Sequence, residues 1–508
     1  MKKIVTLLLS RSFLFGSLML IQVAILLSLI SFLSLNYLMA YTLMTIISFF
    51  VVIYIINKDL NPSYKIAWIL VVLLLPLVGG VLYLFFGGKR IPKNLRQQEL
   101  RNIQMKHYAL KNEEKILKEL KQENVEVYGI FNYLRNHAYS TTYNDTDISY
   151  YSSGDFMYQK MLLDIKNAKK YIFLEFFIIK PGSMWHEILT LLKEKIAEGV
   201  EVYLLYDDFG VTHWFDKNFE KELISSGIKV KVFNKLKPIL LVYMNNRDHR
   251  KILVVDGKIG YTGGINIADE YIDRKIVFGK WKDGGVRLEG RAVDSLVYLF
   301  LQMFYEGVGI EKQYKTYCSK RHNIISNGIV CPFGDSPTDG ELVGRDVHLS
   351  LINRANHSIY ITTPYLILDQ ELKVGLSLAA RRGVDVKIIV PGIADKKIVN
   401  QVTKSNYEYL ANNGVEIYEY KPGFMHLKTM LIDDNLAYVG TINMDYRSYY
   451  LHFECGVLIY QSRCLADLKE DIIETIEVSE LITIDDIRSI NIFIKIIRAI
   501  LNLMAPIM

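Results

Sequence analysis

The chain opens with an apolar region in which three long hydrophobic runs follow one another. They cover residues 12–35, 38–56 and 66–86, and none of them contains a charged side chain. Each run is close to the roughly 20 residues that a helix needs to cross the hydrocarbon core of a bilayer. Together they are too long for a cleaved signal peptide. The pattern predicts transmembrane helices in residues 1–90 and a multi-pass protein of the cell membrane.

Basic residues flank this region on both sides. Lys2, Lys3 and Arg11 precede the first run, and Lys89 and Arg90 begin a stronger basic cluster after the third. Because basic segments next to membrane helices stay in the cytoplasm, we expect the rest of the chain to face the cytoplasm. The link between the first two runs is only two residues long. An arrangement in which one run re-enters the membrane or lies in its interface is the alternative.

After this region the apolar runs become shorter. Residues 91–125 are rich in charge and predict a solvated linker helix, and beyond them short β-branched and aromatic runs alternate with helical stretches, which is typical of an α/β domain. Four predicted strands recur in the same order later in the chain: 171–179 as 358–367, 200–207 as 384–390, 228–233 as 415–420, and 251–256 as 428–433. The sequence therefore predicts a duplicated α/β domain, with repeats at 126–315 and 316–485 related by a pseudo-twofold axis.

The last segment, residues 486–508, is apolar at most positions, but Lys495 and Arg498 interrupt it. Two cations in the middle of a membrane-spanning helix are costly. We therefore expect a helix that lies in the membrane interface, with its cations reaching toward lipid headgroups. A terminal helix packed on the protein's own core is the alternative.

Composition limits the classes of ligand. A net charge of +6 over 508 residues is too small to favour a nucleic acid as the partner, but it suits contact with an anionic lipid surface. The four cysteines show no metal-type spacing. We expect no metal and no cofactor, and the oligomeric state is not readable from the sequence.

One short motif, His-x-Lys-(x)4-Asp, occurs twice, and each copy is followed by Gly-(Gly/Thr)-x-Asn. A single copy would be weak evidence, but two copies at equivalent places of a repeat are hard to obtain by chance. The duplication predicts that each repeat contributes half of one shared site. The candidate catalytic residues are His249, Lys251, Asp256, His426, Lys428 and Asp433.

These residue types match the needs of phosphodiester chemistry. Two imidazoles can act as nucleophile and as proton donor, and two lysine ammoniums can face the non-bridging oxygens. Small residues and amides after each motif predict a phosphate-binding role for four positions: Gly264, Asn266, Thr441 and Asn443. The motif aspartates Asp256 and Asp433 open turns, so local hydrogen bonding is the better interpretation of their place in the motif.

An acid behind each imidazole would hold it in one tautomer. Asp283 follows His249 by 34 residues and Glu454 follows His426 by 28, and the two acids stand in similar contexts, DGGVRL and ECGVLI. We therefore expect Asp283 and Glu454 to orient the two rings.

The motifs and their surroundings resemble those of bacterial cardiolipin synthases of the phospholipase D superfamily. The resemblance extends over nearly the whole chain and includes PLVGGVLYLFFGGKR, DHRKILVVDGKIGYTGGINIADEY and FMHLKTMLIDDNLAYVGTINMDYRSYYLHFE. It implies phospholipase D-like α/β/α domains and transfer of a phosphatidyl group between two phosphatidylglycerol molecules, with cardiolipin and glycerol as products. It also implies a phosphohistidine intermediate without a metal, with His249 as nucleophile and His426 as acid/base.

Two places depart from the pattern of that family. Gly284 and Gly285 stand where the family usually has Thr-His, and His452 stands where it usually has Asn. Both places lie beside the expected orienting acids, so they bear on the choice of headgroup. A phospholipase D-type hydrolase, or a transphosphatidylase that uses another alcohol, is the alternative function. A membrane-tethered nuclease and a catalytically silent scaffold fit the residues less well.

Overall fold

The computed structural model describes residues 38–75, 78–87, 114–236, 245–306, 310–318 and 328–507, with isolated positions at 21, 24, 25, 28, 31, 32, 308, 324 and 326. Most of the expected hydrophobic run at 12–35 and most of the predicted linker helix at 91–125 lie outside the described residues.

The described residues of the first repeat form a seven-stranded sheet in the order β1-β9-β7-β6-β2-β3-β4. Its strands are β1 (Thr146–Tyr151), β2 (Tyr171–Phe176), β3 (Glu201–Asp207), β4 (Lys229–Phe233), β6 (Ile252–Val255), β7 (Ile259–Gly263) and β9 (Gly285–Gly290). The helices of this part are α9 (Gly154–Lys166), α10 (Ser183–Ala197), α11 (Asp208–Val211), α12 (Phe219–Ser225), η2 (Asp269–Ile272), α13 (Val293–Phe304) and α14 (Ile310–Tyr317).

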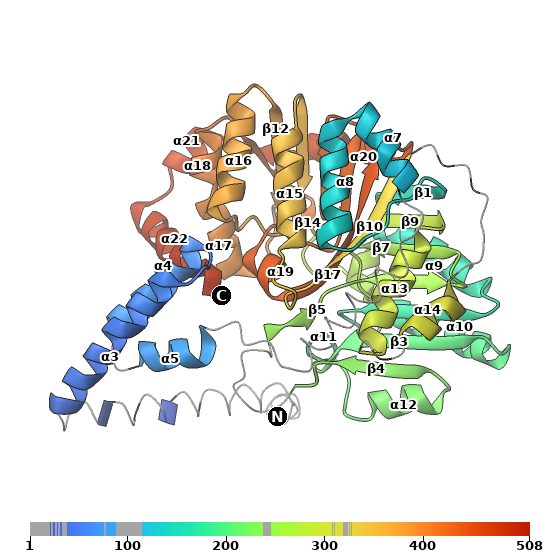
Figure 1. The fold of residues 1–508 in the computed structure, drawn as a ribbon, viewed down its shortest axis with the longest axis horizontal. Coiled ribbons are helices and arrows are strands. Elements are labelled where there is room, and N and C mark those ends of the chain that lie inside the picture. Colours follow the sequence, from blue (N-terminus) through green and yellow to red (C-terminus); the bar gives the residue numbers. More distant parts are fainter. Residues whose placement is uncertain are drawn as a thin grey trace.

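The second repeat builds the same sheet again, in the order β10-β17-β16-β15-β11-β12-β13, with β18 added at the edge (Figure 1). Its strands are β10 (Ile329–Asp335), β11 (Ser358–Thr362), β12 (Asp385–Pro391), β13 (Glu416–Tyr420), β15 (Thr429–Ile432), β16 (Leu436–Gly440), β17 (His452–Tyr460) and β18 (Ser479–Leu481). The helices are α15 (Val343–Arg354), α16 (Gln370–Arg381), α17 (Lys397–Ser405), α18 (Tyr407–Ala411), α19 (Tyr446–Tyr450), α20 (Cys464–Glu477) and α21 (Ile484–Arg488). The identical strand order confirms the predicted duplication of an α/β domain.

The two sheets share one core. Phe173 and Leu288 of the first sheet and Leu431 and Val457 of the second belong to a single buried cluster, which also contains residues of α13 and α20. The outer faces carry separate clusters, with α9 and α10 on the first sheet and α15 and α16 on the second. Because apolar surface is buried between the sheets, the two repeats are held as one body.

Two helices before the first sheet belong to the second core. Helix α7 (Glu114–Glu123) and helix α8 (Val125–His137) contribute Leu117, Phe131 and Leu134 to the cluster under α15. Tyr133 also donates a hydrogen bond of 3.1 Å to Asp346 of α15. The start of the predicted first repeat, at residue 126, therefore packs on the second repeat.

Two short strand pairs cross between the repeats. Strand β5 (Arg247–Asp248) pairs in parallel with β17, and β14 (Gly423–Met425) pairs in parallel with β8 (Lys280–Lys282). Each of β5 and β14 ends immediately before a motif histidine. The two crossed pairs therefore carry the halves of the expected site toward each other.

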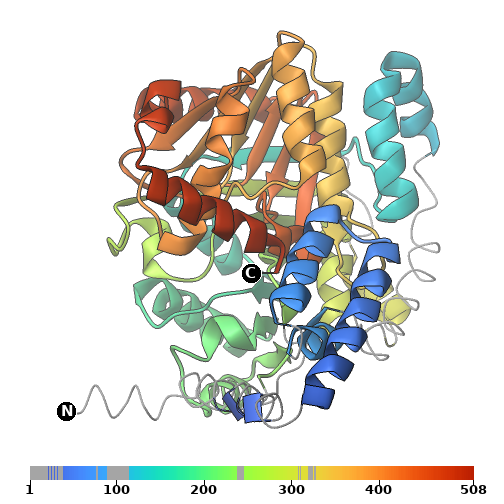
Figure 2. The ribbon, with the colours of Figure 1, turned by 90° about the vertical axis from the view of Figure 1, so that its left-hand side faces the viewer.

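The terminal helices lie together at one end of the molecule. Three of them, α3 (Leu38–Asn57), α4 (Pro62–Leu74) and α5 (Gly79–Phe86), come before the first repeat. The other two, α22 (Ile492–Met504) and η3 (Ala505–Ile507), come after the second repeat. Figure 2 shows α4 beside α22 and the end of the chain, and a hydrogen bond of 3.1 Å joins Asn61 to Tyr450 of α19. Among the described residues, no helix meets both the length and the apolar character required to cross a membrane.

Candidate active site

The two motif histidines are held by the crossed strand pairs. The His249 backbone N–H donates to the carbonyl oxygen of Phe453 at 2.9 Å, and the His426 N–H donates to that of Lys282 at 2.8 Å. Both side chains are about one-tenth exposed. These backbone hydrogen bonds therefore fix the position of each histidine in the site.

Each ring contacts an acid of the other repeat. Nδ1 of His249 lies 2.9 and 3.0 Å from the two carboxylate oxygens of Glu454, and Nδ1 of His426 lies 2.6 Å from Oδ2 of Asp283. The expected acids are therefore at the rings, and each acid lies at the ring of the other repeat rather than at the histidine that it follows along the chain. The crossed strands explain the exchange, because the residue after β8 faces the residue after β14. An acid at Nδ1 leaves Nε2 of each ring for chemistry.

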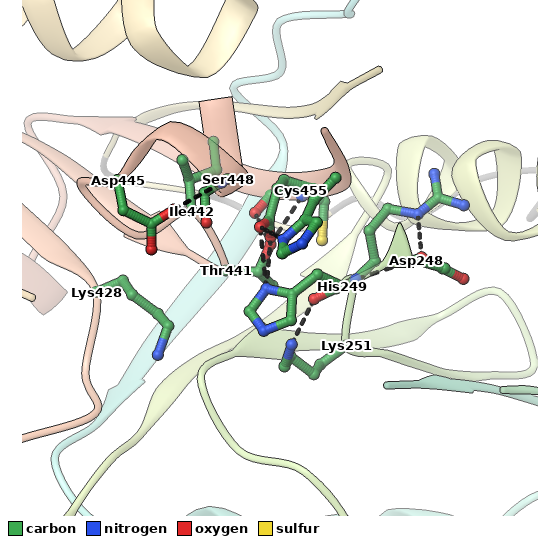
Figure 3. Close-up of polar contacts among 12 residues, drawn as sticks. Asp248, His249, Lys251, Lys428, Thr441, Ile442, Asp445, Ser448 and Cys455 are labelled. Carbon is green, nitrogen blue, oxygen red and sulfur yellow. Dashed lines mark hydrogen bonds and ion pairs between the residues drawn. The ribbon is translucent and has the colours of Figure 1, made fainter. Parts of the chain in front are cut away.

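The motif lysines lie on the two sides of the His249 ring (Figure 3). Both are buried, and the Nζ atoms of Lys251 and Lys428 donate to the carbonyl oxygens of His249 and His426. Burial lowers the pKa of Lys251 to about 8 and that of Lys428 to about 7. Two desolvated ammoniums gain stability from a bound anion, so they suit a phosphate group between the rings.

The surroundings of both imidazoles favour their neutral form. Burial lowers the pKa of His426 to about 4 and the pKa of His249 well below its usual value, and the neighbouring lysine charges lower both further. A neutral ring can attack phosphorus. The other ring can acquire its proton when a phosphodiester brings negative charge to the site, because an opposite charge raises the pKa of an imidazole.

The four positions expected to bind phosphate differ in their contacts. A Cβ at Gly264 would overlap Oδ1 of Asp283, so only glycine fits there, whereas Oγ1 of Thr441 donates to Glu454 at 2.6 Å. The Asn266 amide is already used, because its Oδ1 accepts from the N–H of Ile178 at 3.0 Å and its Nδ2 donates to the hydroxyl of Tyr271 at 2.8 Å.

Asn443 is the counterpart of Asn266 in the second repeat. It is buried, and its Oδ1 has no hydrogen-bond partner among the described residues. An amide oxygen does not bind an anion, but the Nδ2 group of Asn443 can donate to a phosphate oxygen. The phosphate role predicted for the two amides therefore fits Asn443 better than Asn266, whose amide is already used.

The motif aspartates lie at the far ends of strands β6 and β15. Asp256 accepts from the backbone N–H groups of residues 169–171 at 2.7–2.9 Å, and Asp433 accepts from those of residues 356–358. A four-residue strand separates each aspartate from its lysine, a rise of roughly 13 Å. These carboxylates anchor the neighbouring strands β2 and β11 and do not contact the imidazoles. Their partners are 85–87 residues away for Asp256, so the expectation of hydrogen bonding within the local turn is wrong, although the contacts are structural.

The surroundings of the two rings differ, and the sequence analysis had not singled out most of these neighbours. The His426 ring lies among aromatic side chains, with ring centroids 5.4 Å from Tyr271, 5.6 Å from Trp281 and 5.7 Å from Phe424. The His249 ring lies 5.4 Å from the ring of His452 and 5.2 Å from that of Phe177. A position-by-position alignment of the two repeats would have revealed this difference, because it pairs Phe424 with the cation Arg247 in the first repeat.

One group in the described part of the chain has the spacing of metal ligands. His249, His452 and Glu454 offer three ligand atoms that lie within 4.8 Å of one another. All three belong to the site itself, and the charges of Lys251 and Arg247 bear directly on His452. A positive environment of this kind opposes a divalent cation and favours an anion.

Comparisons with known proteins agree with this fold. A family model described as the cardiolipin synthase, PLD-like domain matches residues 161–276 and 348–476, and a model described as the phospholipase D-nuclease N-terminal region matches residues 46–88. Among solved structures, phosphatidylserine synthase of Haemophilus influenzae superposes with a TM-score of 0.53 at 16% sequence identity, over 71% of this chain and 93% of that one. At this identity the likeness shows the shared fold of two phospholipase D-like domains.

Relatives of similar length are closer in sequence. An uncharacterised protein of Streptococcus mutans is 41% identical over 461 residues, which is 90% of this chain and 99% of that protein. Cardiolipin synthase 2 of Staphylococcus epidermidis is 33% identical over 92% of this chain and 96% of its own length. A cardiolipin synthase of Clostridium perfringens is 32% identical over 88% and 95%. The chain belongs to the cardiolipin synthase family of the phospholipase D superfamily.

Proposed function

We propose that this protein joins two phosphatidylglycerol molecules into cardiolipin, releases glycerol, and uses neither a metal nor a cofactor. The observation that carries the proposal is the pair of imidazoles, each held at Nδ1 by a buried acid and each flanked by a buried lysine. The family relatives named cardiolipin synthase support the choice of lipid substrate.

The reaction proceeds in two displacements at one phosphorus. Nε2 of His249 attacks the phosphorus of the first lipid, the bond to the glycerol oxygen breaks, and His426 gives that oxygen a proton. A hydroxyl of the second lipid then loses its proton to His426 and attacks, and the phosphorus–nitrogen bond breaks. The resemblance to the superfamily supports this order of the two rings. One phosphodiester replaces another, so no nucleotide is needed.

Lys251 and Lys428 stabilise the non-bridging oxygens in both displacements. The attraction between the two ammoniums and the non-bridging oxygens becomes stronger as negative charge develops on these oxygens. Because both lysines are buried, little water weakens this attraction. Asn443 can add a hydrogen bond from its amide. Asp283 and Glu454 hold the two rings with Nε2 toward the phosphorus and stabilise whichever ring is protonated.

The membrane contributes to the choice between transfer and hydrolysis. In this proposal residues 1–90 anchor the chain as a multi-pass region, residues 126–485 face the cytoplasm, and residues 486–508 lie in the interface. Exposed apolar side chains on α22 support the last point, with Ile492 62%, Phe493 72% and Ile500 57% exposed. The contact between α22 and α4 supports the proposal that both helices meet the same membrane surface. A site close to that surface would have lipid acceptors at high concentration and little water.

The test uses the full chain in detergent with labelled phosphatidylglycerol and a chelator. The proposal expects cardiolipin and free glycerol in equal amounts. Phosphatidic acid as the sole labelled product would replace the proposal with a hydrolase, and loss of activity with chelator would overturn the metal-free mechanism. The His249→Ala variant serves as the inactive control.

A further inference from the structure

The pseudo-twofold relation allows the two sides of the site to be compared residue by residue. Positions 177 residues apart are equivalent around the motifs, so Arg247 corresponds to Phe424 and Arg447 corresponds to Glu270. The residue two before each orienting acid is His452 on one side and Trp281 on the other. Three basic residues therefore stand at positions in one half whose equivalents in the other half are two aromatic residues and an acid.

The basic residues on the His249 side come from adjacent elements. Arg247 and His452 are direct partners in the pairing of β5 with β17. Nδ1 of His452 lies 3.4 Å from Oε1 of Glu454, the acid that also holds His249. Arg447 lies on α19, the short helix that leads into β17. A second imidazole therefore lies beside the His249 ring, at 5.4 Å between ring centroids, and the two guanidiniums are close enough to that imidazole for their charges to act on it.

The charges of this group act on one another. Arg247 is held by Asp207, 3.3 Å away, and by the carbonyl of Asn234. Burial lowers the pKa of Arg447, the negative charge of Asp445 opposes this effect, and the charge of Arg247 adds to it. Burial and then the charges of Arg447, Lys251 and Arg247 lower the pKa of His452. Cations that repel one another at a site gain stability when an anion binds between them.

On the His426 side, none of the three equivalent positions carries a positive charge. Glu270, the counterpart of Arg447, forms an ion pair with Lys180, and Trp281 and Phe424 lie with ring centroids 4.9 Å apart. An anion placed there would meet aromatic faces, whose quadrupole repels negative charge. The difference in charge therefore selects the His249 side for an anionic group.

We propose that Arg447 and His452, with Arg247 behind them, form a subsite for a second phosphodiester, that of the acceptor lipid. The inference rests on the proposed function, because only an anionic acceptor brings a second phosphate next to the one being transferred. Two phosphates linked through one glycerol repel each other, and a cationic subsite offsets that repulsion. Water or a neutral alcohol as acceptor would not require it.

The experiment compares three acceptors with one donor. The full chain in detergent is given phosphatidylglycerol as the donor, and transfer is measured to phosphatidylglycerol, to soluble glycerol phosphate and to isotope-labelled glycerol, whose transfer product is labelled phosphatidylglycerol. The variants are Arg447→Gln and His452→Asn, the latter restoring the residue usual in the family. Arg381→Gln, which removes an exposed cation at the end of α16, is the matched control.

We expect Arg447→Gln to weaken transfer to both phosphate-bearing acceptors roughly 10- to 100-fold, the loss typical of a hydrogen bond to a charged group. His452→Asn should have a smaller effect in the same direction. Transfer to glycerol should change by no more than about twofold in Arg447→Gln, and Arg381→Gln should behave as the unaltered protein. The comparison with glycerol is made for Arg447→Gln alone, because His452 contacts Glu454, the acid that holds His249.

Equal losses with all three acceptors would overturn the subsite and leave the proposed function standing. A loss with the lipid acceptor alone would also overturn it, in favour of a contact with lipid rather than with phosphate. An unaltered protein that makes no cardiolipin but transfers to glycerol would instead contradict the proposed function.

Discussion

The two imidazoles of the site occupy the same backbone frame in different surroundings. His249 and His426 each follow a crossed strand, contact a buried acid of the other repeat and precede a buried lysine. Around His426 the walls are aromatic, whereas around His249 they are basic. The histidine, lysine and acid are thus present in both repeats, whereas the side chains that surround the two rings differ.

This contrast separates two kinds of residue. In the proposed mechanism, the histidines, the lysines and the acids, which have the same place in both halves, act on the phosphorus that the halves share. Residues that differ between the halves would then contact different parts of the substrates. Variants in the first group should affect every acceptor, and variants in the second group should affect some acceptors only.

The most severe test of the shared frame removes one ring. His249→Ala and His426→Ala should each lower turnover by about 10³-fold or more, because nucleophile and acid/base act as one unit. Turnover is measured as glycerol release, and retention of the fold is measured by circular dichroism and size in detergent. His186→Ala, at an exposed position of α10, is the control. Near-normal activity in either ring variant would contradict a site shared between the repeats.

A donor with a good leaving group sharpens the comparison of the two rings. A nitrophenyl phosphodiester needs no proton donor to release nitrophenolate, so His426→Ala should retain a burst of about one equivalent while His249→Ala shows none. Rapid mixing with absorbance detection measures the burst. The reverse pattern would assign the nucleophile to His426.

The crossed acids are tested by neutral replacements. Asp283→Asn and Glu454→Gln should lower kcat by about 10²- to 10⁴-fold with little change in KM, because the ring loses its fixed tautomer. In protein labelled with ¹⁵N-histidine, Asp283→Asn should shift the Nδ1 resonance of His426 and leave that of His249 in place. A shift of the His249 resonance instead would contradict the exchange of acids between repeats.

The lysines predict the dependence on pH. Protonated lysine binds the phosphate, and the pKa values of Lys428 and Lys251 are about 7 and about 8, so kcat/KM should fall as pH rises through this range. On the acid side it should fall near pH 4, where the free His426 ring becomes protonated. In Lys428→Arg, the guanidinium keeps its charge, and the remaining alkaline decline should move up toward the pKa of Lys251. An alkaline limb that is unchanged in this variant would remove Lys428 as its cause.

The smallest effect on chemistry is expected at the motif aspartates. Asp256→Asn and Asp433→Asn each weaken several backbone hydrogen bonds to a carboxylate, which should lower the free energy of unfolding by about 1–3 kcal/mol. Thermal unfolding in detergent measures this loss, and kcat per folded molecule should change by less than about threefold. A loss of kcat at full stability would assign the aspartates a chemical role.

The strand pattern and the motif were readable from the sequence because both are local. The apolar runs of β2 and β11 and the turns after β6 and β15 depend on neighbouring residues, so their order exposed the duplication. The acids were also found, since Asp283, just before β9, and Glu454, within β17, stand in similar sequence contexts. Their partners were not found, because the paired residues are 143 and 205 residues apart.

What the sequence alone determined is therefore the inventory: two α/β repeats, two histidine–lysine motifs and the two acids. Only the tertiary structure decided which acid meets which ring, that the Asn266 amide is already occupied, and that one ring lies among cations and the other among aromatic side chains. The physical reason is the crossing of β5 and β14 into the opposite repeat. Residue spacing along one chain does not encode which of two equivalent sheet edges a short strand will join.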